Sequence, residues 1–423
     1  MTTTKTHTSN ISLYTIVKSM ANGMDLISET VVGHHKKVAY IASQLGKQLD
    51  LSKKEIRKLI ITSLIHDLGV FHLNQTFSNL SFDSKNNQHA KVGYLLSRNL
   101  FPDKKVPEII KYHHHEWGNN KENIPHYSHL LFLADRIAVL IKDKIDILSQ
   151  SAKIKNNIKN HSGKRFWPEA VDKFMNLVNI ESFWLDVISE KRIENHLNTF
   201  FSDNSSFLNF EDLNNISLLI SHIIDFRSPF TATHTRGVAA SASKLAQYLD
   251  FSKKDTKMMN IAGNLNDLGK LIVPVEILNK PGKLKSKEWN IMKTHTYFTY
   301  HTFDNSEKLE DIKKWAAYHH EKLNGNGYPF HLTDKDLSLG ARIMAVADIF
   351  TAISENRPYR EGMKAEEIKN ILTEMVENNE IDGKVVSVII DNFDEFKKEV
   401  TVSQNNAQDY YQRFKEKVKE ITD

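Results

Sequence analysis

Apolar residues recur at three- and four-residue spacing along most of the chain. VAYIASQLGKQL (38–49) and VAASASKLAQYL (238–249) each give a helix one apolar face. Ser52 and Ser252 precede Lys-Lys-Glu and Lys-Lys-Asp, which predicts that a further helix starts after each stretch. Sustained alternation typical of strands is nearly absent. The pattern therefore predicts an all-α fold.

The two halves of the chain repeat one another. LDLSKKEIRKLIITSLIHDLG (49–69) aligns without gaps on LDFSKKDTKMMNIAGNLNDLG (249–269), with nine of 21 positions identical. Three further pairs follow in the same order: HAKVGYLL with HTYFTYHTF, YHHHEWGN with YHHEKLNGNGYP, and FLADRIAVL with AVADIFTAI. One such match could arise by chance in a lysine-rich chain, but a series in order indicates a duplicated unit. We expect two related helical bundles in tandem.

The repeat suggests three segments. Residues 1–149 form the first bundle, 150–212 a helical connector, and 213–423 the second bundle with its C-terminal helices. The connector is rich in aromatic residues, which we expect to pack the two bundles together. The charged amphipathic pattern of the last sixty residues favours packing or dimerisation, so a homodimer through the C-terminal or connector helices is one prediction.

Composition narrows the location and the partners. The 423 residues contain no cysteine, which excludes disulfides and thiolate metal sites. No apolar run reaches the roughly 18–20 residues that span a bilayer, and the start of the chain does not resemble a signal peptide. Lys and Arg (56) barely exceed Asp and Glu (52) and both signs are interspersed, which is typical of a solvated surface. We therefore predict a cytoplasmic protein with no membrane or DNA partner.

Polar residues beside apolar runs in the first copy have the types that bind metals. A single buried histidine is more often a hydrogen-bonded core residue than a ligand, but a set repeated in order in a second unit favours a metal centre. Residues on the inner face of a helical bundle can converge on one centre. Five histidines and two carboxylates suffice for two borderline ions with one bridging carboxylate. The candidate ligands are His34, His66, Asp67, His89, His114, His115 and Asp135.

The order His, His-Asp, His, His-His, Asp resembles the HD superfamily of metal-dependent phosphohydrolases. The second copy is more specific. NDLGKLIVPVEILNKPGKLKSKEWNIMKTH, HHEKLNGNGYPFHL and GARIMAVADIFTAISENRPYR are similar to an HD-GYP domain, a bacterial cyclic-dinucleotide phosphodiesterase. The resemblance covers about 213–365, and it extends to 30–142 as a plain HD domain.

The resemblance implies roles for residues of the second copy. Asp267 would bridge two metals, and Lys270 would neutralise a phosphate oxygen as a catalytic and substrate-binding group. Arg357 and Arg360 would contact phosphate or guanine, with helix-end capping as their alternative role. The full implied metal set is His234, Asn266, Asp267, His295, His319, His320 and Asp348, and the loop at the pocket mouth is Gly325, Gly327, Tyr328 and Pro329.

The implied cofactors are two divalent ions in each complete site, with Fe, Mn, Mg and Ni as candidates. Some members of the family hold a third ion through a glutamate one turn before the first histidine. Thr30 and Phe230 stand at that position here, which favours a two-metal site.

The two copies show complementary defects. Asn266 stands where the family has a histidine, whereas the first copy has Val70 in place of the lysine and lacks the GYP loop. We expect a phosphodiesterase that hydrolyses 3′3′-cyclic GMP-AMP or cyclic di-GMP in the second copy. Two alternatives stay open. The second copy could be a cyclic-dinucleotide sensor while the first hydrolyses another substrate, or both sites could be remnants in a signalling module.

Overall fold

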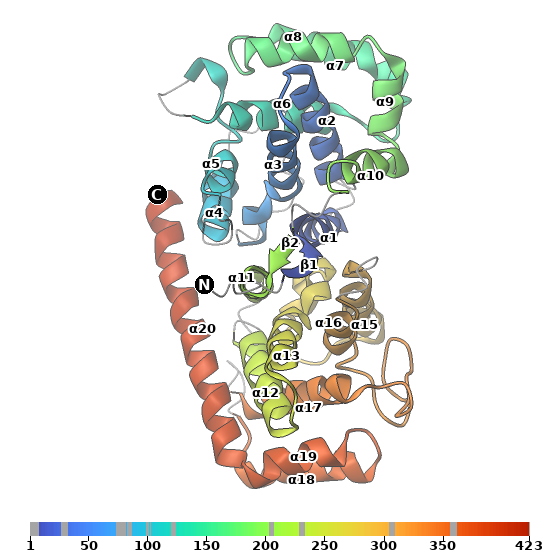
Figure 1. Cartoon of the computed structure of the whole chain (residues 1–423), viewed down its shortest axis with the longest axis vertical. Coiled ribbons are helices and arrows are strands. Elements are labelled where there is room, and N and C mark those ends of the chain that lie inside the picture. Colours follow the sequence, from blue (N-terminus) through green and yellow to red (C-terminus); the bar gives the residue numbers. More distant parts are fainter. Residues whose placement is uncertain are drawn as a thin grey trace, which may run out of the picture. The chain divides into compact units, whose positions relative to one another are not determined.

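The computed structural model describes residues 8–26, 33–72, 82, 87–98, 101, 103–119, 124–202, 207–227, 233–303, 309–355 and 362–422. Helices dominate these ranges (Figure 1), which confirms the predicted all-α fold. A small sheet of β1 (Thr8–Ser12) and β2 (Phe207–Asn209) is also present, and the hydrophobic pattern did not indicate it.

The chain divides into two compact units. We call Ser12–Phe207 with Val418–Asp423 the first bundle, and Met1–Ile11 with Leu208–Lys417 the second bundle. The first bundle contains α1 (Leu13–Leu26), α2 (His34–Gln48), α3 (Lys53–Ile65), the 3-10 helix η2 (Leu68–His72), α4 (Gln88–Ser97), α5 (Lys105–Lys111), η4 (Trp117–Asn119), α6 (His126–Leu140), α7 (Ile147–Asn160), α8 (Pro168–Leu177), α9 (Glu181–Val187) and α10 (Glu190–Asn198).

The second bundle repeats the first part of this order and then adds helices of its own. Its elements are α11 (Phe210–Arg227), α12 (His234–Tyr248), α13 (Lys253–Leu265), η6 (Leu268–Ile272), α14 (Val275–Leu278), α15 (Ser286–Thr302), α16 (Glu310–Ala317), α17 (Leu339–Ser354), α18 (Ala365–Glu377), α19 (Gly383–Asp391) and most of α20 (Phe393–Thr422).

Each bundle has the same core of three helices. α2 packs against α3 and α6, and α12 packs against α13 and α17. The apolar positions predicted to face inward do so, since Val38 and Val238 are both fully buried. Burying a valine side chain stabilises the fold by about 1.5–3 kcal/mol. The apolar stripe of the sequence is thus what holds the metal-ligand helices together.

Capping residues fix where the third helix of each repeat begins. The Ser52 hydroxyl accepts from the Glu55 N–H, and the Glu55 carboxylate accepts from the Ser52 N–H. Ser252 accepts from the Asp255 N–H in the same way, so the predicted N-caps are confirmed. Because these caps set the helix start, they also set the position of its last turn, where the His-Asp pair of the repeat follows.

The predicted connector residues pack within the first bundle. α8 and α10 contact α2, and α7 contacts α6. Described aromatic side chains of the connector lie against this bundle: Phe183 contacts Tyr40 of α2, Trp184 and Phe174. The reason is that each connector helix is amphipathic and α2 offers the apolar face that covers it.

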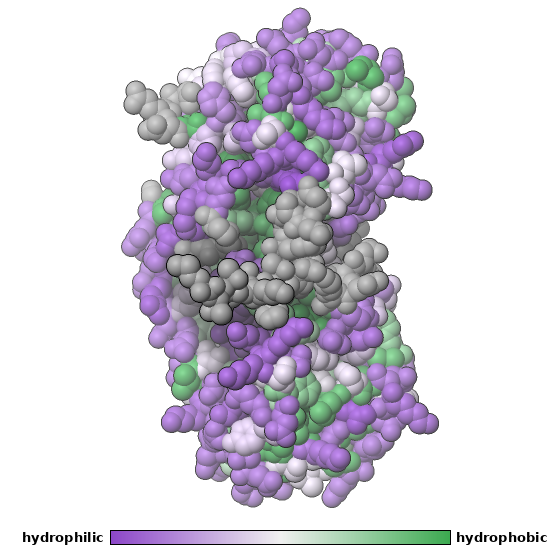
Figure 2. Space-filling model, viewed as in Figure 1, coloured by the Kyte–Doolittle hydropathy of each residue, from purple (hydrophilic) through white to green (hydrophobic). Residues whose placement is uncertain are grey.

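The C-terminal helices pack as predicted. In the second bundle the Phe226 ring on α11 stacks on Tyr411 and Phe414 of α20, with ring centroids 5.3 and 4.6 Å apart. The face shown in Figure 2 is mostly hydrophilic, with apolar side chains in separate patches. In the described ranges, no helix has both the length and the apolar character needed to cross a bilayer.

Candidate metal centres

The polar residues of the first repeat meet inside the first bundle. They come from the start of α2, the end of α3, α4, the turn after α5, and α6. Donor atoms of Asp67, His89, His113 and His114 lie within 4.8 Å of one another, and so do those of His34, His66 and Asp135. We call the whole set, with His35, the first centre.

Asp67 lies at the middle of the first centre. Its Oδ1 is 3.2 Å from His89 Nε2 and 3.7 Å from His113 Nε2. Its Oδ2 faces a different set, 3.2 Å from His66 Nε2 and 3.9 Å from His34 Nε2. Each carboxylate oxygen therefore serves its own group of imidazoles, which is the arrangement that a carboxylate bridging two cations requires.

Buried positive groups in and beside the first centre balance its two carboxylates. Burial alone would raise the pKa of Asp67, but the positive charge of His66 and the neighbouring imidazoles of His113 and His89 lower this pKa well below its usual range. Burial opposes protonation of His66, yet Asp67 and Asp135 together raise its pKa to about 9. In the absence of a metal, an imidazolium thus compensates Asp67, whereas Asp135 is paired with the buried Arg136 guanidinium, 2.5 Å from its Oδ2.

Backbone carbonyls fix the tautomer of four candidate ligands. His66 Nδ1 donates to the Ser63 carbonyl at 2.8 Å, and His113 Nδ1 to the Ile110 carbonyl at 2.6 Å. In the second bundle His295 and His319 bond the Met292 and Ala316 carbonyls at 2.7 Å each. In all four the carbonyl lies three residues earlier, on the last helical turn or one turn back. A proton held on Nδ1 leaves the Nε2 lone pair directed at the centre, as metal ligation requires.

The glycine of each Asp-Leu-Gly motif allows its 3-10 helix to approach the next helix closely. A Cβ added to Gly69 would lie 2.0 Å from the His89 carbonyl oxygen, and one added to Gly269 would lie 1.9 Å from that of His295. These are overlaps with backbone, which no side-chain movement relieves. The Asp-Leu-Gly motif of the repeat therefore brings the next histidine against the aspartate.

The structure places His113 in the first centre, and His115 outside it. His115 Nε2 lies 2.9 Å from the Asn119 carbonyl, on the side of the loop. His113 and His114 correspond to His319 and His320, so His115 corresponds to Glu321. In the sequence Tyr-His-His-His, the ligand pair could be the first two histidines or the last two. The alignment of Tyr112 with Tyr318 was the signal that the last two, His114 and His115, are the wrong pair.

The second centre gathers fewer imidazoles. Donor atoms of His295, His319 and His320 lie within 4.8 Å of one another. Asp267 Oδ1 is 3.6 Å from His295 Nε2 and 4.0 Å from His319 Nε2, which reproduces one side of the first centre. This half of the second centre can therefore hold one ion in the same way.

Lys270 stands on the other side of Asp267. Its Nζ lies 2.6 Å from Asp267 Oδ2, the oxygen whose counterpart in the first centre faces imidazoles. Burial opposes ionisation, but Lys270 and the neighbouring histidines lower the pKa of Asp267 below its usual range. The first bundle has Val70 here. Oδ2 of the central aspartate thus faces an ammonium in the second centre and imidazoles in the first.

Asn266 lies beside His234 and Asp348. Its Nδ2 is 3.5 Å from Asp348 Oδ1, and His234 Nε2 is 3.0 Å from that oxygen. His234 Nδ1 lies 3.4 Å from Glu355 Oε2, so a buried carboxylate orients this imidazole. Sequence reasoning missed Glu355, because it lies seven residues after Asp348 at the helix end with no motif to mark it. A cation bound here would have one imidazole donor, from His234, beside the oxygens of Asn266 and Asp348.

The GYP loop lies against the second centre. The Tyr328 ring is 4.9 Å from the His320 ring, and the Tyr328 N–H donates to the His320 carbonyl. Glu321 fastens the loop by accepting from the N–H groups of Phe330 and Leu332 at 2.7 and 2.9 Å. A Cβ on Gly327 would lie 2.4 Å from the Glu321 Cα, and Gly325 has a φ of 76°. Both glycines are thus required by the loop itself, and Pro329 follows Tyr328 in it.

Four residues of the sequence predictions lie outside the described ranges. They are Thr30, Phe230, Arg357 and Arg360.

The residues of the first centre fit metal ions. Asp67 Oδ1 and Oδ2, His34 Nε2, His66 Nε2 and His113 Nε2 are buried and lack a hydrogen-bond partner among the described residues. Buried polar atoms ordinarily have one, and a mixture of imidazole and carboxylate donors suits borderline divalent ions. In the second centre the three imidazoles beside Asp267 fit one such ion.

Comparisons with known proteins agree with the repeat. Residues 31–140 and residues 219–385 each match a family model described as an HD domain. A 3′3′-cGAMP-specific phosphodiesterase 1 of Vibrio cholerae is 29% identical over 95% of this chain and 94% of its own length. A cyclic di-GMP phosphodiesterase of Thermotoga maritima is 31% identical over 49% of this chain and 55% of its own length.

A solved structure shares the fold over nearly the whole chain. The crystal structure of a cyclic GMP-AMP specific phosphodiesterase of Vibrio cholerae has a TM-score of 0.63 at 23% identity, and the match covers 93% of this chain and 98% of that one. Each bundle here carries a histidine-aspartate centre within an HD match. The chain belongs to the HD superfamily of metal-dependent phosphohydrolases, as a protein with two HD domains in tandem.

Proposed function

We propose that this protein is a phosphodiesterase of the HD-GYP kind that opens a cyclic dinucleotide, 3′3′-cyclic GMP-AMP or cyclic di-GMP, to its linear form in the second bundle. The observation that carries the proposal is the arrangement around Asp267, with imidazoles on Oδ1 and Lys270 on Oδ2. The names of the relatives support this class of substrate.

His295, His319 and His320 would hold an ion beside Asp267. Such an ion supplies a water of lowered pKa and positive charge for the phosphoryl oxygens. The carbonyl partners of His295 and His319 keep both rings oriented before substrate arrives. Asp267 keeps its charge because its pKa is lowered, so it remains a ligand across the neutral range.

Lys270 and the loop would act on the substrate itself. The Lys270 ammonium is only partly buried and can move from Asp267 to a phosphate oxygen, where it would stabilise the developing negative charge. Tyr328 presents an aromatic ring next to His320, and such a ring can stack on a nucleobase. We place Gly325, Gly327 and Pro329 in the same wall, and Arg357 and Arg360 as further contacts to phosphate or guanine.

The two centres should differ in their ions. We propose two divalent ions in the first centre, and in the second centre one ion at the imidazoles with a weaker position at His234, Asn266 and Asp348. Fe, Mn and Ni suit imidazole donors, whereas Mg and Mn suit oxygen donors such as the Asn266 amide.

A second candidate has an observation in its favour. The first centre has imidazoles on both oxygens of Asp67, whereas the second has them on one oxygen of Asp267. The second bundle could then be a cyclic-dinucleotide sensor, with hydrolysis of another substrate in the first.

One comparison of variants separates the two candidates. The full chain would be tested for linearisation of both cyclic dinucleotides, with His295→Ala, His66→Ala and the exposed His301→Ala as matched control on the same helix as His295. We expect His295→Ala to lose about a hundredfold or more in turnover, and the other two to retain most of it. Loss with His66→Ala alone would assign the reaction to the first bundle, and tight binding without turnover would leave a sensor.

Self-association belongs to the same proposal. Ile180, Leu185 and Ile188 of the connector helices are 53%, 50% and 46% exposed, which is high for large apolar side chains. We propose that they bury against a second copy. Sedimentation of the full chain should show a dimer that Leu185→Glu dissociates, and a wild-type monomer at all concentrations would reject this.

A further inference from the structure

His35 lies in the first centre although no family motif includes it. It is fully buried, and its Nε2 is 3.7 Å from Asp67 Oδ2. Donor atoms of His35, His66 and Asp67 lie within 4.8 Å of one another, so they meet the same geometric condition as the other ligand groups. His34 and His35 follow one another at the start of α2, where successive side chains are about 100° apart. Both can therefore face the centre from its edge.

Asp25 holds the His35 ring in place. Asp25 Oδ1 lies 2.5 Å from His35 Nδ1 and also accepts the His35 backbone N–H at 3.3 Å. A carboxylate on Nδ1 fixes the proton on that nitrogen and directs the Nε2 lone pair toward Asp67 and His66. Imidazole ligands of metals are commonly oriented in this way, and the carboxylate makes the ligand more basic. Asp25 would thus be a positioning residue.

The second bundle keeps the carboxylate but not the imidazole. Asp225 and Thr235 stand at the places of Asp25 and His35, and the Thr235 hydroxyl donates to Asp225 Oδ1 at 3.2 Å. At the place of His66 it has Asn266. The two imidazoles that share a group in the first centre are therefore both replaced in the second, while the aspartate between them is retained. This joint replacement is expected if the two histidines serve one ion.

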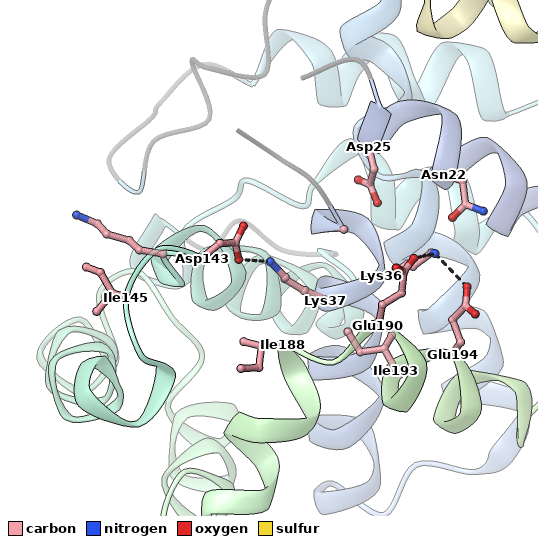
Figure 3. A pocket seen from close by; sticks show the side chains of 12 residues that line it. Asn22, Asp25, Lys36, Lys37, Asp143, Ile145, Ile188, Glu190, Ile193 and Glu194 are labelled. Atoms are coloured by element: carbon pink, nitrogen blue, oxygen red, sulfur yellow. Dashed lines mark hydrogen bonds and ion pairs between the residues drawn. The ribbon is translucent and has the colours of Figure 1, made fainter. Parts of the chain in front are cut away.

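A pocket in the first bundle reaches the buried Asp25. The pocket has a volume of about 740 Å³ and is lined by Asn22, Asp25, Lys36, Lys37, Asp143 and Glu194, among others. In Figure 3 the Asp25 carboxylate lies at the pocket, and Lys36 and Lys37 are each paired with acidic side chains. The positive charges of these two lysines are thus balanced within the pocket.

We propose that His35, positioned by Asp25 and replaced by Thr235 in the second bundle, is a metal ligand that completes, with His66 and Asp67, one of the two cation positions of the first centre. Its donors are two imidazoles and one carboxylate, which favours Zn²⁺, Ni²⁺ or Fe²⁺ over Mg²⁺. The inference concerns the first bundle and goes beyond the reaction proposed for the second.

Metal content tests the proposal without any turnover. The full chain would be freed of metal, titrated with Zn²⁺ alone, and measured by calorimetry and by mass spectrometry of bound metal. We expect His35→Thr to lose one bound ion, or to weaken one site at least about tenfold, and Asp25→Asn to weaken it by about 10–100-fold. His115→Ala, a neighbouring histidine outside the centre, should bind as the wild type does.

Two further measurements separate ligation from a structural role. The metal-free chain should keep the wild-type circular dichroism with His35→Thr, because Thr235 makes the equivalent hydrogen bond to Asp225 in the second bundle, and the variant should lower the melting temperature more with Zn²⁺ than without it. The reverse change, Thr235→His with Asn266→His, should add one Zn²⁺ to the second bundle. Wild-type Zn²⁺ binding by folded His35→Thr would overturn the proposal. If that variant does not fold, a folded double variant that gains no ion would overturn it instead. A failure here leaves the proposed phosphodiesterase reaction untouched, because that reaction is assigned to His295 and Lys270.

Discussion

Asn266 and His66 occupy the same place in the two bundles, one residue beyond a helix end, and offer a metal different donors. An amide oxygen is a neutral and weaker donor to borderline ions than an imidazole. We expect Asn266→His to raise the metal affinity of the second centre by about tenfold, because Asp348 and His234 already flank the position. Calorimetric titration and metal analysis would measure it. Unchanged affinity and unchanged stoichiometry would show that residue 266 is not at a ligand position.

Lys270 should act on the reaction and not on metal content. Replacing it with methionine keeps the aliphatic stem and removes the charge that faces Asp267 Oδ2. We expect Lys270→Met to lower kcat by about 10²–10³-fold, the usual cost of losing one group that stabilises transition-state charge, while the bound metal stays the same. Steady-state kinetics with metal analysis of the same sample would decide. A loss of metal in parallel with kcat would mean that Lys270 maintains the centre instead.

The sequence identified most of these residues, and the misses have physical causes. His66, Asp67, His89 and Asp135 were marked by the repeat. His113 was missed because three adjacent histidines allow two registers, which only the alignment of Tyr112 with Tyr318 distinguishes in the sequence, and the turn after α5 then places His113 inward and His115 toward Asn119. His35 was missed because its partner, Asp25, lies ten residues away on another helix, and spacing of that kind has no signature.

At the scale of elements, Gly269 determines how close η6 comes to α15. Gly269→Ala would force a Cβ into the His295 carbonyl, 1.9 Å away, and should displace that ligand as well as destabilise the second bundle by about 2–4 kcal/mol. Gly23→Ala on α1 is the matched control. A Cβ there meets nothing within 4 Å, so it should be neutral or stabilise by about 0.5–1 kcal/mol. Thermal unfolding and Zn²⁺ binding of both variants would test this, and a Gly269→Ala chain with normal stability and binding would contradict it.

The contact between α11 and α20 should make the second bundle sensitive to acid. His222 stacks on Tyr410 at 4.0 Å, and burial together with the charge of Arg236 lowers the pKa of His222 to about 3. In the unfolded chain this histidine titrates near pH 6.5. Below that pH the unfolded state therefore binds a proton that the folded state does not. The stabilising effect is complete above about pH 6.5 and is lost as the pH falls toward 3.

His222→Phe should remove this acid sensitivity. Between pH 7 and pH 5.5 the wild type should lose about 1 kcal/mol more of its free energy of unfolding than the variant does. Urea unfolding at the two pH values would measure the difference, with the exposed His301→Phe as control. If the wild type and His222→Phe lose the same amount, His222 is not responsible.

The helices were well predicted where the amphipathic pattern and the caps agree, as at Ser52 and Ser252. The packing of the connector on α2 was not predicted. Amphipathicity shows that Phe183 and Trp184 are buried but not against which partner, and the answer depends on the apolar outer surface of α2, which no local pattern describes. The strand pair of β1 and β2 was also missed, since a three-residue strand is too short for its alternation to be recognised.

For the whole molecule, duplication produced two centres that compensate a buried aspartate differently. Asp67 has imidazoles on both oxygens, and Asp267 has imidazoles on one and an ammonium on the other. The first arrangement favours tight metal binding, whereas the second leaves a mobile charge next to a loop that can contact substrate. The difference between the two centres could be inferred from Asn266 and Val70, but the ion pair of Lys270 with Asp267 that accompanies it could not.

Removal of metal should therefore destabilise the first bundle more than the second. Without ions, the charge of Asp67 is compensated by protonation of His66, and this compensation is still present at pH 8 because the pKa of His66 is raised to about 9, so the loss on chelation is that of the bound ions. Asp267 has the Lys270 Nζ 2.6 Å from its Oδ2, and this partner does not depend on a bound ion. A ligand that binds only the folded state stabilises it by about 2.7 kcal/mol at a hundredfold excess over Kd, so the first bundle should lose at least this much on chelation.

Calorimetry at pH 8 with and without chelator should show one transition moving down by several degrees and the other nearly still. His66→Ala should abolish the shift in melting temperature, which would assign the moving transition to the first bundle. A larger shift that survives in His66→Ala and disappears in His295→Ala would assign it to the second bundle instead.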